Sequence, residues 1–194
     1  MKERITMTEF DWGFNPKLPK KDVYNLLATQ FVRDGEDALL IGSPGTGKSH
    51  IAQAVALAAI EAGHKVIFRE ASRFFQDLFE ATQLNSRPKV SKLFSEADLL
   101  IIDDLFLRKN LSGNAPDDLL DIILNRYNAR KSTLITSNRP IEDWGALLKD
   151  NAASSAILDR LLHRGHLLPF EGKSYRLKEA SRRLINHRNS KKLG

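Results

Sequence analysis

The segment GSPGTGKS at residues 42–49 constrains the fold of this chain more than any other. It fits the pattern GxxxxGK[ST] and stands directly between the apolar run ALLI and the alanine-rich run HIAQAVALAAI. A loop of this kind, between a buried strand and a helix, turns its backbone N–H groups onto phosphate oxygens. An ordinary glycine-rich turn before a helix is the alternative. The expected phosphate-binding residues are Gly42, Ser43, Pro44, Gly45, Thr46, Gly47, Lys48, Ser49 and His50.

Two side chains of this loop carry most of the expected chemistry. Lys48 should reach the β- and γ-phosphates of a nucleoside triphosphate, and the Ser49 hydroxyl should bind Mg²⁺. The sequence therefore predicts ATP and Mg²⁺ as cofactors.

Short apolar or β-branched runs alternate with helical patterns along the chain. Such alternation predicts an α/β fold with a parallel sheet, right-handed crossovers and helices on both faces. The alanine-rich residues 49–62 and the stripe of apolar residues at 74–79 are expected to be two of these helices. The five expected strands are Ala38–Ile41, Lys65–Phe68, Leu99–Ile102, Thr133–Thr136 and His166–Leu168.

The stretch LLIIDDLF at residues 99–106 runs four aliphatic residues into two adjacent aspartates. Ligands of open α/β sheets bind at the carboxyl ends of the strands, so both acids are expected beside the phosphate loop. Asp103 then holds the magnesium ion, and Asp104 orients and polarises the attacking water, which makes the chemistry hydrolysis. A plain strand-to-turn junction is the alternative, because aspartate favours turns.

A third polar residue follows the strand STLITSN. Asn138 is expected at the same edge of the sheet, where its amide can hold the attacking water or the γ-phosphate. The alternative is structural, since the sequence SNRP also makes a good turn.

Charge is unevenly distributed along the 194 residues. The net charge is +6, and residues 173–194 alone carry +7, which leaves −1 for the rest. A basic tail on a nearly neutral body favours a polyanionic partner, although a solvated tail is the alternative. The tail residues most available for DNA are Lys178, Arg182, Arg183, Arg188, Lys191 and Lys192, with Arg108 and Lys109 as alternatives on the core.

Cysteine and long apolar segments are both missing from the sequence. The lack of cysteine excludes disulfides and thiolate metal sites. The longest apolar run, Ala54–Ile60, is too short to span a bilayer, and residues 1–14 lack a secretory apolar segment. We therefore expect a cytoplasmic protein with no membrane partner.

Taken together, the motifs resemble the IstB-type transposition helper ATPases of bacterial insertion sequences, relatives of DnaC and DnaA in the AAA+ class. The resemblance runs from about residue 10 to 176 and is carried by EFDWGFNP, IGSPGTGKSH, LLIIDDL, STLITSNRPIEDWG, AILDRLLHRGHLLPFEG and KSYRL. It implies a three-layer AAA+ core with strand order 5-1-4-3-2, ATP-driven homo-oligomer assembly on double-stranded DNA, and cooperation with the transposase of the same element.

The resemblance also assigns residues. It places Walker B on Asp103 and Asp104, sensor 1 on Asn138 and the arginine finger on Arg160; Arg176 matches sensor 2 only weakly. A local ion pair with Asp159 is the alternative role for Arg160. The family usually has glutamate where this chain has Asp104, and the shorter reach of aspartate predicts either slower hydrolysis or a further water between the carboxylate and the attacking water.

The resemblance suggests three parts: an amino-terminal segment at 1–36, the ATPase core at 37–172 and the basic tail at 173–194, with no full helical lid. The predicted function is an ATP-hydrolysing, DNA-binding assistant of a transposase in target selection. A DnaC-like helicase loader and a nucleotide-gated DNA-binding module with negligible turnover are the alternatives.

Overall fold

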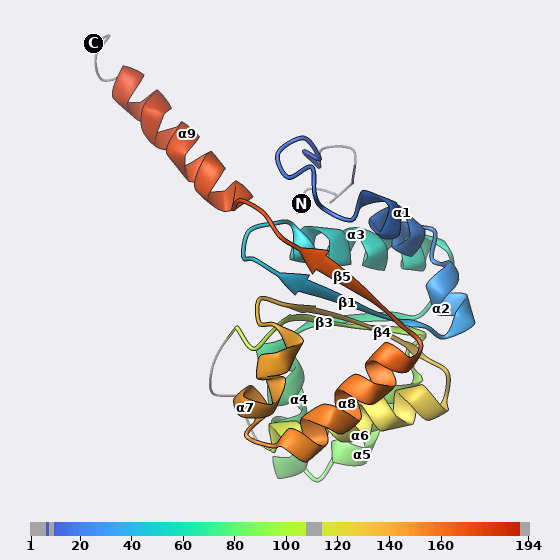
Figure 1. Ribbon diagram of the computed structural model, residues 1–194. Coiled ribbons are helices and arrows are strands. Elements are labelled where there is room, and N and C mark those ends of the chain that lie inside the picture. The colour runs from blue at the N-terminus through green and yellow to red at the C-terminus, as the bar shows by residue number, and fades with distance from the viewer. Residues whose placement is uncertain (1–6, 8–9, 108–113, 191–194) are drawn as a thin grey trace.

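One five-stranded parallel sheet organises the chain (Figure 1). The computed structural model describes residues 7, 10–107 and 114–190, and the side chains of 185–190 lie outside the described set. The strand order β2-β3-β4-β1-β5 is the expected order 5-1-4-3-2 read from the opposite edge, so that prediction is confirmed. The strands are β1 (Asp37–Gly42), β2 (Val66–Glu70), β3 (Leu99–Leu105), β4 (Ser132–Ser137) and β5 (Gly165–Phe170).

Three helices cover one face of the sheet (Figure 1). They are α1 (Lys20–Leu27), α2 (Gln30–Asp34) and α3 (Lys48–Glu61). Buried residues of these helices, such as Phe31 and Val55, pack against Leu40, Ile101 and Leu134 of the central strands. Residues that precede β1 therefore share the hydrophobic core of the sheet.

The opposite face is covered by a second group of helices. Alternate strand residues such as Leu39, Ile102 and Ile135 point to this side, as the two-residue period of a strand requires. They pack against an aromatic cluster that includes Phe74 and Phe94. The helices are α4 (Ala71–Gln83), α5 (Arg87–Glu96), α6 (Ala115–Asn128), α7 (Trp144–Leu148) and α8 (Asn151–His163), with the 3-10 turn η2 (Ile141–Asp143) before α7.

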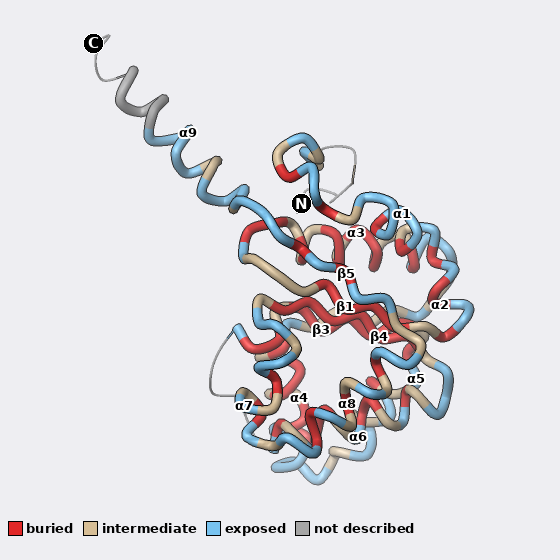
Figure 2. The backbone as a smooth tube through the Cα atoms, in the orientation of Figure 1, coloured by how far each residue is buried: buried red, intermediate tan, exposed pale blue. Residues whose placement is uncertain are grey.

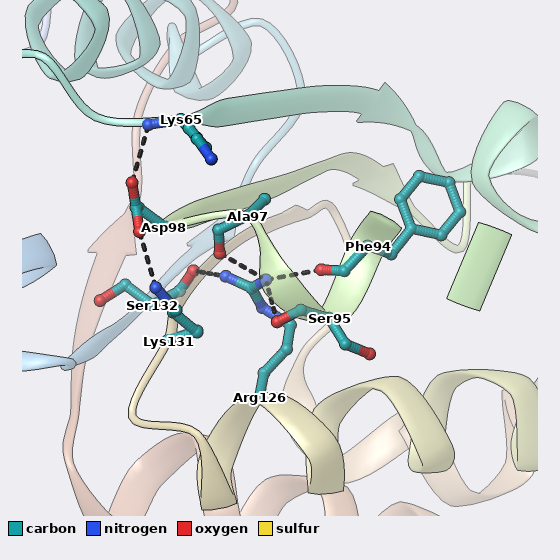
Figure 3. Close-up of polar contacts among 8 residues, drawn as sticks. All are labelled: Lys65, Phe94, Ser95, Ala97, Asp98, Arg126, Lys131 and Ser132. Atoms are coloured by element: carbon teal, nitrogen blue, oxygen red, sulfur yellow. Dashed lines mark hydrogen bonds and ion pairs between the residues drawn. The ribbon is translucent and has the colours of Figure 1, made fainter. Parts of the chain in front are cut away.

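A buried arginine ties the amino ends of β3 and β4 to the helices of this second face (Figure 3). Arg126 of α6 donates through Nη1 to the carbonyl oxygens of Phe94 at 2.6 Å and Ala97 at 2.9 Å. Its Nη2 donates to the carbonyl oxygen of Ser132, and Nε donates to Thr133 Oγ1 at 3.0 Å. These bonds satisfy carbonyl groups that the end of α5 and the strand entrances leave open.

The last helix, α9 (Tyr175–Ser190), leaves the body of the molecule (Figures 1 and 2). Its apolar residues Leu177 and Leu184 are 70% and 65% exposed. None of the helices in the described part of the chain is long and apolar enough to cross a bilayer.

Candidate nucleotide-binding site

The phosphate loop lies between β1 and α3, as the sequence predicts, and two of its glycines allow close packing by other segments. Gly45 and Gly47 have φ angles of +75° and +104°. A Cβ at position 45 would lie 2.1 Å from Ser174 Oγ, and one at position 47 would lie 2.6 Å from the Phe10 ring. Only glycine combines these backbone angles with such contacts.

Lys48 begins α3 and points back into the loop. Its Nζ donates to the carbonyl oxygens of Gly42 and Ser43, both at 2.8 Å. The side chain is nearly buried, and burial lowers the pKa of its ammonium group to about 8. Thr46 closes the same turn by donating to the Ser43 carbonyl oxygen at 2.8 Å. The cation is thus held where phosphate oxygens are expected.

The strand that carries the two acids continues further than the sequence suggested. β3 runs to Leu105, with an irregularity in its pairing to β4 between Ile102 and Leu105. Asp104 adopts a φ of +56°, which lets its N–H donate to Thr136 Oγ1 at 2.8 Å. The same hydroxyl donates to Asp103 Oδ1 at 2.5 Å. One threonine of β4 therefore orients both aspartates.

The two acids differ in environment. Asp103 is buried, whereas Asp104 is half-exposed. Burial and the adjacent Asp103 charge raise the pKa of the Asp104 carboxyl. A raised pKa makes this carboxylate a stronger base, and that suits the expected polarisation of water.

A polar cavity of about 380 Å³ opens beside the loop at the carboxyl ends of the strands. The predicted residues Asp103, Asp104 and Asn138 all line this cavity with the loop. Residues that the sequence reasoning did not assign also line it, namely Gln53, Glu70 and Tyr175, together with the weak candidate Arg176. Glu70 pairs in register with Asp103 at the end of β2. The strand predicted from the sequence ended at Phe68, and for this reason Glu70 was not recognised as a neighbour of the two aspartates.

A second cavity, of about 260 Å³, lies on the other side of the loop. Its walls are largely apolar and aromatic, with Phe10, Phe14 and Leu18 from the segment before α1. Gly47, His50 and Tyr175 line both cavities, so the two are neighbours. The pair offers an apolar compartment for a base beside a polar compartment for phosphates.

The residues at the polar compartment fit a magnesium ion. Asp103 uses one carboxylate oxygen for Thr136, which leaves the other oxygen for a cation, and Ser49 lines the same cavity. Among the described residues no three Asp, Glu, His or Cys side chains converge on one point. A Mg²⁺ ion here would take its other ligands from phosphate oxygens and water, as this ion commonly does.

Arg160 lies away from this cleft. Its Nη1 donates to the Ala156 carbonyl oxygen at 3.2 Å and lies 3.4 Å from Asp159 Oδ2. It is not among the residues that line either cavity. Within one chain, therefore, the contacts described for this side chain are local, to Ala156 and Asp159.

The fold and the cleft together define a P-loop domain of the AAA+ class. The structure of AMPPCP-bound DnaA from Aquifex aeolicus superposes with a TM-score of 0.70 at 24% identity, covering 95% of this chain and 56% of that chain. The crystal structure of the DnaC helicase loader gives a TM-score of 0.65 at 22% identity, covering 78% of this chain and 87% of that chain. At these identities the likeness concerns the fold.

The chain belongs to the IstB-like ATP binding protein family, whose model matches residues 1–183. A Pseudomonas aeruginosa relative, named as an ATP-binding protein of insertion sequence IS21, is 38% identical over 175 residues, or 90% of this chain. A Geobacillus stearothermophilus relative, named for insertion sequence IS5376, is 33% identical over 176 residues, or 91% of this chain. The chain spans 65% and 69% of the lengths of these two relatives.

Proposed function

We propose that this chain binds and hydrolyses Mg·ATP in the cleft formed by the two cavities, and that it uses the nucleotide to help a transposase engage target DNA. The observation that carries the proposal is the adjacency of the cavities through Gly47, His50 and Tyr175. The adenine occupies the aromatic compartment, and the triphosphate lies along the loop in the polar one.

Each polar residue then has a task. The loop amides and Lys48 bind the phosphates, and Ser49 and Asp103 hold the magnesium ion, which neutralises phosphate charge when bound. Asp104 accepts the proton of the attacking water, while the Asn138 amide orients that water or the γ-phosphate. Both side chains line the polar compartment.

The proposed partners, double-stranded DNA and a transposase, rest on family membership and on relatives named for insertion sequences. Basic residues of α9, Arg182 and Arg183, are exposed and suit phosphate contacts. The side chain of Arg188 and the whole of Lys191 and Lys192 lie outside the described residues, as do Arg108 and Lys109.

We further propose that the active form is a homo-oligomer in which Arg160 completes the site of a neighbouring copy. Support comes from the position of Arg160, which is one-third exposed and away from its own cleft. A guanidinium supplied across an interface stabilises the charge that develops on the transferred phosphoryl group.

Nucleotide binding tests the site assignment directly. Lys48→Ala should abolish tight Mg·ATP binding in calorimetry, because the variant lacks the cation that faces the phosphates. The matched control is Lys89→Ala, which removes an exposed lysine of α5 and should bind as the parent does. Unchanged affinity in a folded Lys48→Ala protein would contradict the assignment.

Target capture tests the wider function. The chain, the proposed partner transposase and duplex DNA should form a joint complex in the presence of Mg and a slowly hydrolysed ATP analogue. Lys48→Ala should lose that complex, and Lys89→Ala should keep it. Capture that is equal with and without nucleotide would count against ATP control of the partnership.

A further inference from the structure

Two segments that lie far apart in sequence meet above the phosphate loop. The first is the amino-terminal stretch 10–18, and the second is residues 172–178, which comprise the end of the connection after β5 and the first turn of α9. Asn15 connects them: its Nδ2 donates to the Lys173 carbonyl oxygen at 2.9 Å, and its Oδ1 accepts from the Lys173 N–H at 2.8 Å. The side-chain amide thus pairs with both polar groups of one backbone residue.

The packing around Asn15 leaves little freedom for a different arrangement. The residue is 7% exposed, and its two bonds to the exposed residue Lys173 are partly buried. A Cβ at Gly172 would lie 2.5 Å from Asn15 Oδ1, so glycine is what allows the two segments to approach. A buried amide that pairs through both its nitrogen and its oxygen fixes geometry more strongly than an exposed one.

Further contacts reinforce the same junction. Lys178 Nζ lies 2.8 Å from Asp11 Oδ2 and 4.4 Å from the centre of the Phe14 ring. The rings of Phe14 and Tyr175 meet edge to face at 5.6 Å between centroids. Asn15, Asp11, Phe14, Tyr175 and Lys178, with the Lys173 backbone, are called the clasp below.

The clasp contacts the phosphate loop through Tyr175, whose N–H donates to the Gly45 carbonyl oxygen at 2.8 Å. The ring of Phe10, the residue before Asp11, lies against Gly47 of the same loop. Asp11, Phe14, Asn15 and Tyr175 also line the aromatic cavity. The loop, the wall of the base compartment and the first turn of α9 are therefore one connected unit.

The direction of α9 depends on this unit. Beyond its first turn the helix projects from the body, and its residues from 180 to 184 are exposed (Figures 1 and 2). The contacts at its base that the structure describes include the Lys173 backbone, the Tyr175 N–H and Lys178. A change in the clasp would consequently redirect the whole helix.

We propose that Asn15 is a positioning residue that joins the base compartment to α9, so that a bound nucleotide base restrains the helix. The inference rests on the proposed nucleotide site and adds how occupancy of that site reaches a distant element. Because the closed clasp forms the wall that the base touches, base binding and clasp closure favour one another reciprocally. Asn15 lines the aromatic cavity and is not among the described residues that line the polar one.

Comparing two ligands separates this role from a general structural one. Asn15→Ala removes the two hydrogen bonds that hold the clasp closed, so binding of the base must then close it, and Mg·ATP affinity should fall about tenfold, which corresponds to about 1.4 kcal/mol. Inorganic triphosphate with Mg, which has no base, should bind Asn15→Ala as it binds the parent. The matched control is Asn25→Ala, an exposed position on α1 outside the clasp, and it should alter neither affinity.

The outcomes distinguish a loss of the clasp from a loss of the nucleotide site. Equal losses of ATP and triphosphate affinity in Asn15→Ala would mean that the loop has collapsed, and unchanged ATP affinity would mean that the clasp does not shape the base compartment. Either result overturns the proposal. Failure of the nucleotide site would appear separately, as unchanged ATP binding in Lys48→Ala.

The helix supplies a second readout. The chain has no cysteine, so Leu184→Cys creates a single labelling position on the exposed part of α9. A spin label there should lose mobility when Mg·ATP is added to the otherwise parental chain, and should not respond in the Asn15→Ala background at saturating Mg·ATP. Mobility that is insensitive to Mg·ATP in the parental background, or equally sensitive in both, would refute the coupling.

Discussion

Lys48 is 4% exposed, and burial brings the pKa of its ammonium group down to about 8, within reach of ordinary assay conditions. A bound triphosphate favours the charged form and raises that pKa again. The complex then holds more protons than the free protein above pH 8, so Mg·ATP affinity should fall as pH rises.

Calorimetric titrations between pH 7 and 9.5 measure this dependence. The expected slope approaches a tenfold loss of affinity per pH unit above about pH 8. Lys48→Arg keeps its charge throughout this range, so any binding that it retains should show a flat profile. A parent profile as flat as that of Lys48→Arg would contradict the lowered pKa of Lys48.

Asp103 and Asp104 are adjacent, yet they are held differently and should respond differently to the loss of a charge. Asp104→Asn should bind Mg·ATP and lose turnover, because the amide cannot accept the proton of water. Asp103→Asn should instead weaken the magnesium dependence of binding, since it removes a ligand from the ion. Binding titrated against Mg²⁺, together with single-turnover hydrolysis, separates the two. Identical behaviour of the variants would rule out the division of roles.

At the scale of elements, Arg126 connects α5 and α6 to the amino ends of β3 and β4, at the end of these strands opposite the two aspartates (Figure 3). Burial lowers the pKa of its guanidinium to about 10, so the group remains charged at neutral pH. Arg126→Met would leave several buried carbonyl oxygens without donors, and we expect a loss of about 3–5 kcal/mol in the free energy of unfolding.

Equilibrium urea denaturation measures this loss. Arg33→Met is the matched control, because Arg33 is exposed on α2, and its effect should stay within about 0.5 kcal/mol. A cost below about 1 kcal/mol for Arg126→Met would show that water or neighbouring groups replace the lost donors.

At the scale of the whole molecule, Arg160 is not among the described residues that line the cleft of its own chain, and we have proposed that it completes the site of a neighbouring copy. If neighbouring copies complete each other's sites, specific ATPase activity should rise with protein concentration. Mixing inactive Arg160→Ala with inactive Lys48→Ala should then restore part of the activity, because each variant supplies what the other lacks. Mixed oligomers that form and stay inactive at every ratio would exclude this role for Arg160.

The order of strands and helices was accessible from the sequence because it depends on local patterns. Continuous apolar runs such as Leu99–Ile102 are buried on both faces of a parallel sheet, and this is why all five strands were located. The ends of the strands were predicted less accurately. β3 extends through Asp103 and Asp104 to Leu105 because Thr136, 32 residues away from Asp104, supplies a partner for the irregular backbone.

The residues of the candidate site likewise fall into two groups, those that local sequence patterns reveal and those that only long-range contacts reveal. The sequence by itself determined the phosphate loop, the two aspartates and Asn138, since each lies at the end of a strand and the carboxyl ends of parallel strands meet at one edge. Only the tertiary structure decided that Glu70 joins them, that Phe10 and Phe14 line the neighbouring aromatic cavity, and that Asn15 binds Lys173 across 158 positions. A strand or loop motif consists of residues that are neighbours in sequence and can be recognised there. These contacts instead join residues far apart in sequence and form only when the folded sheet brings them together.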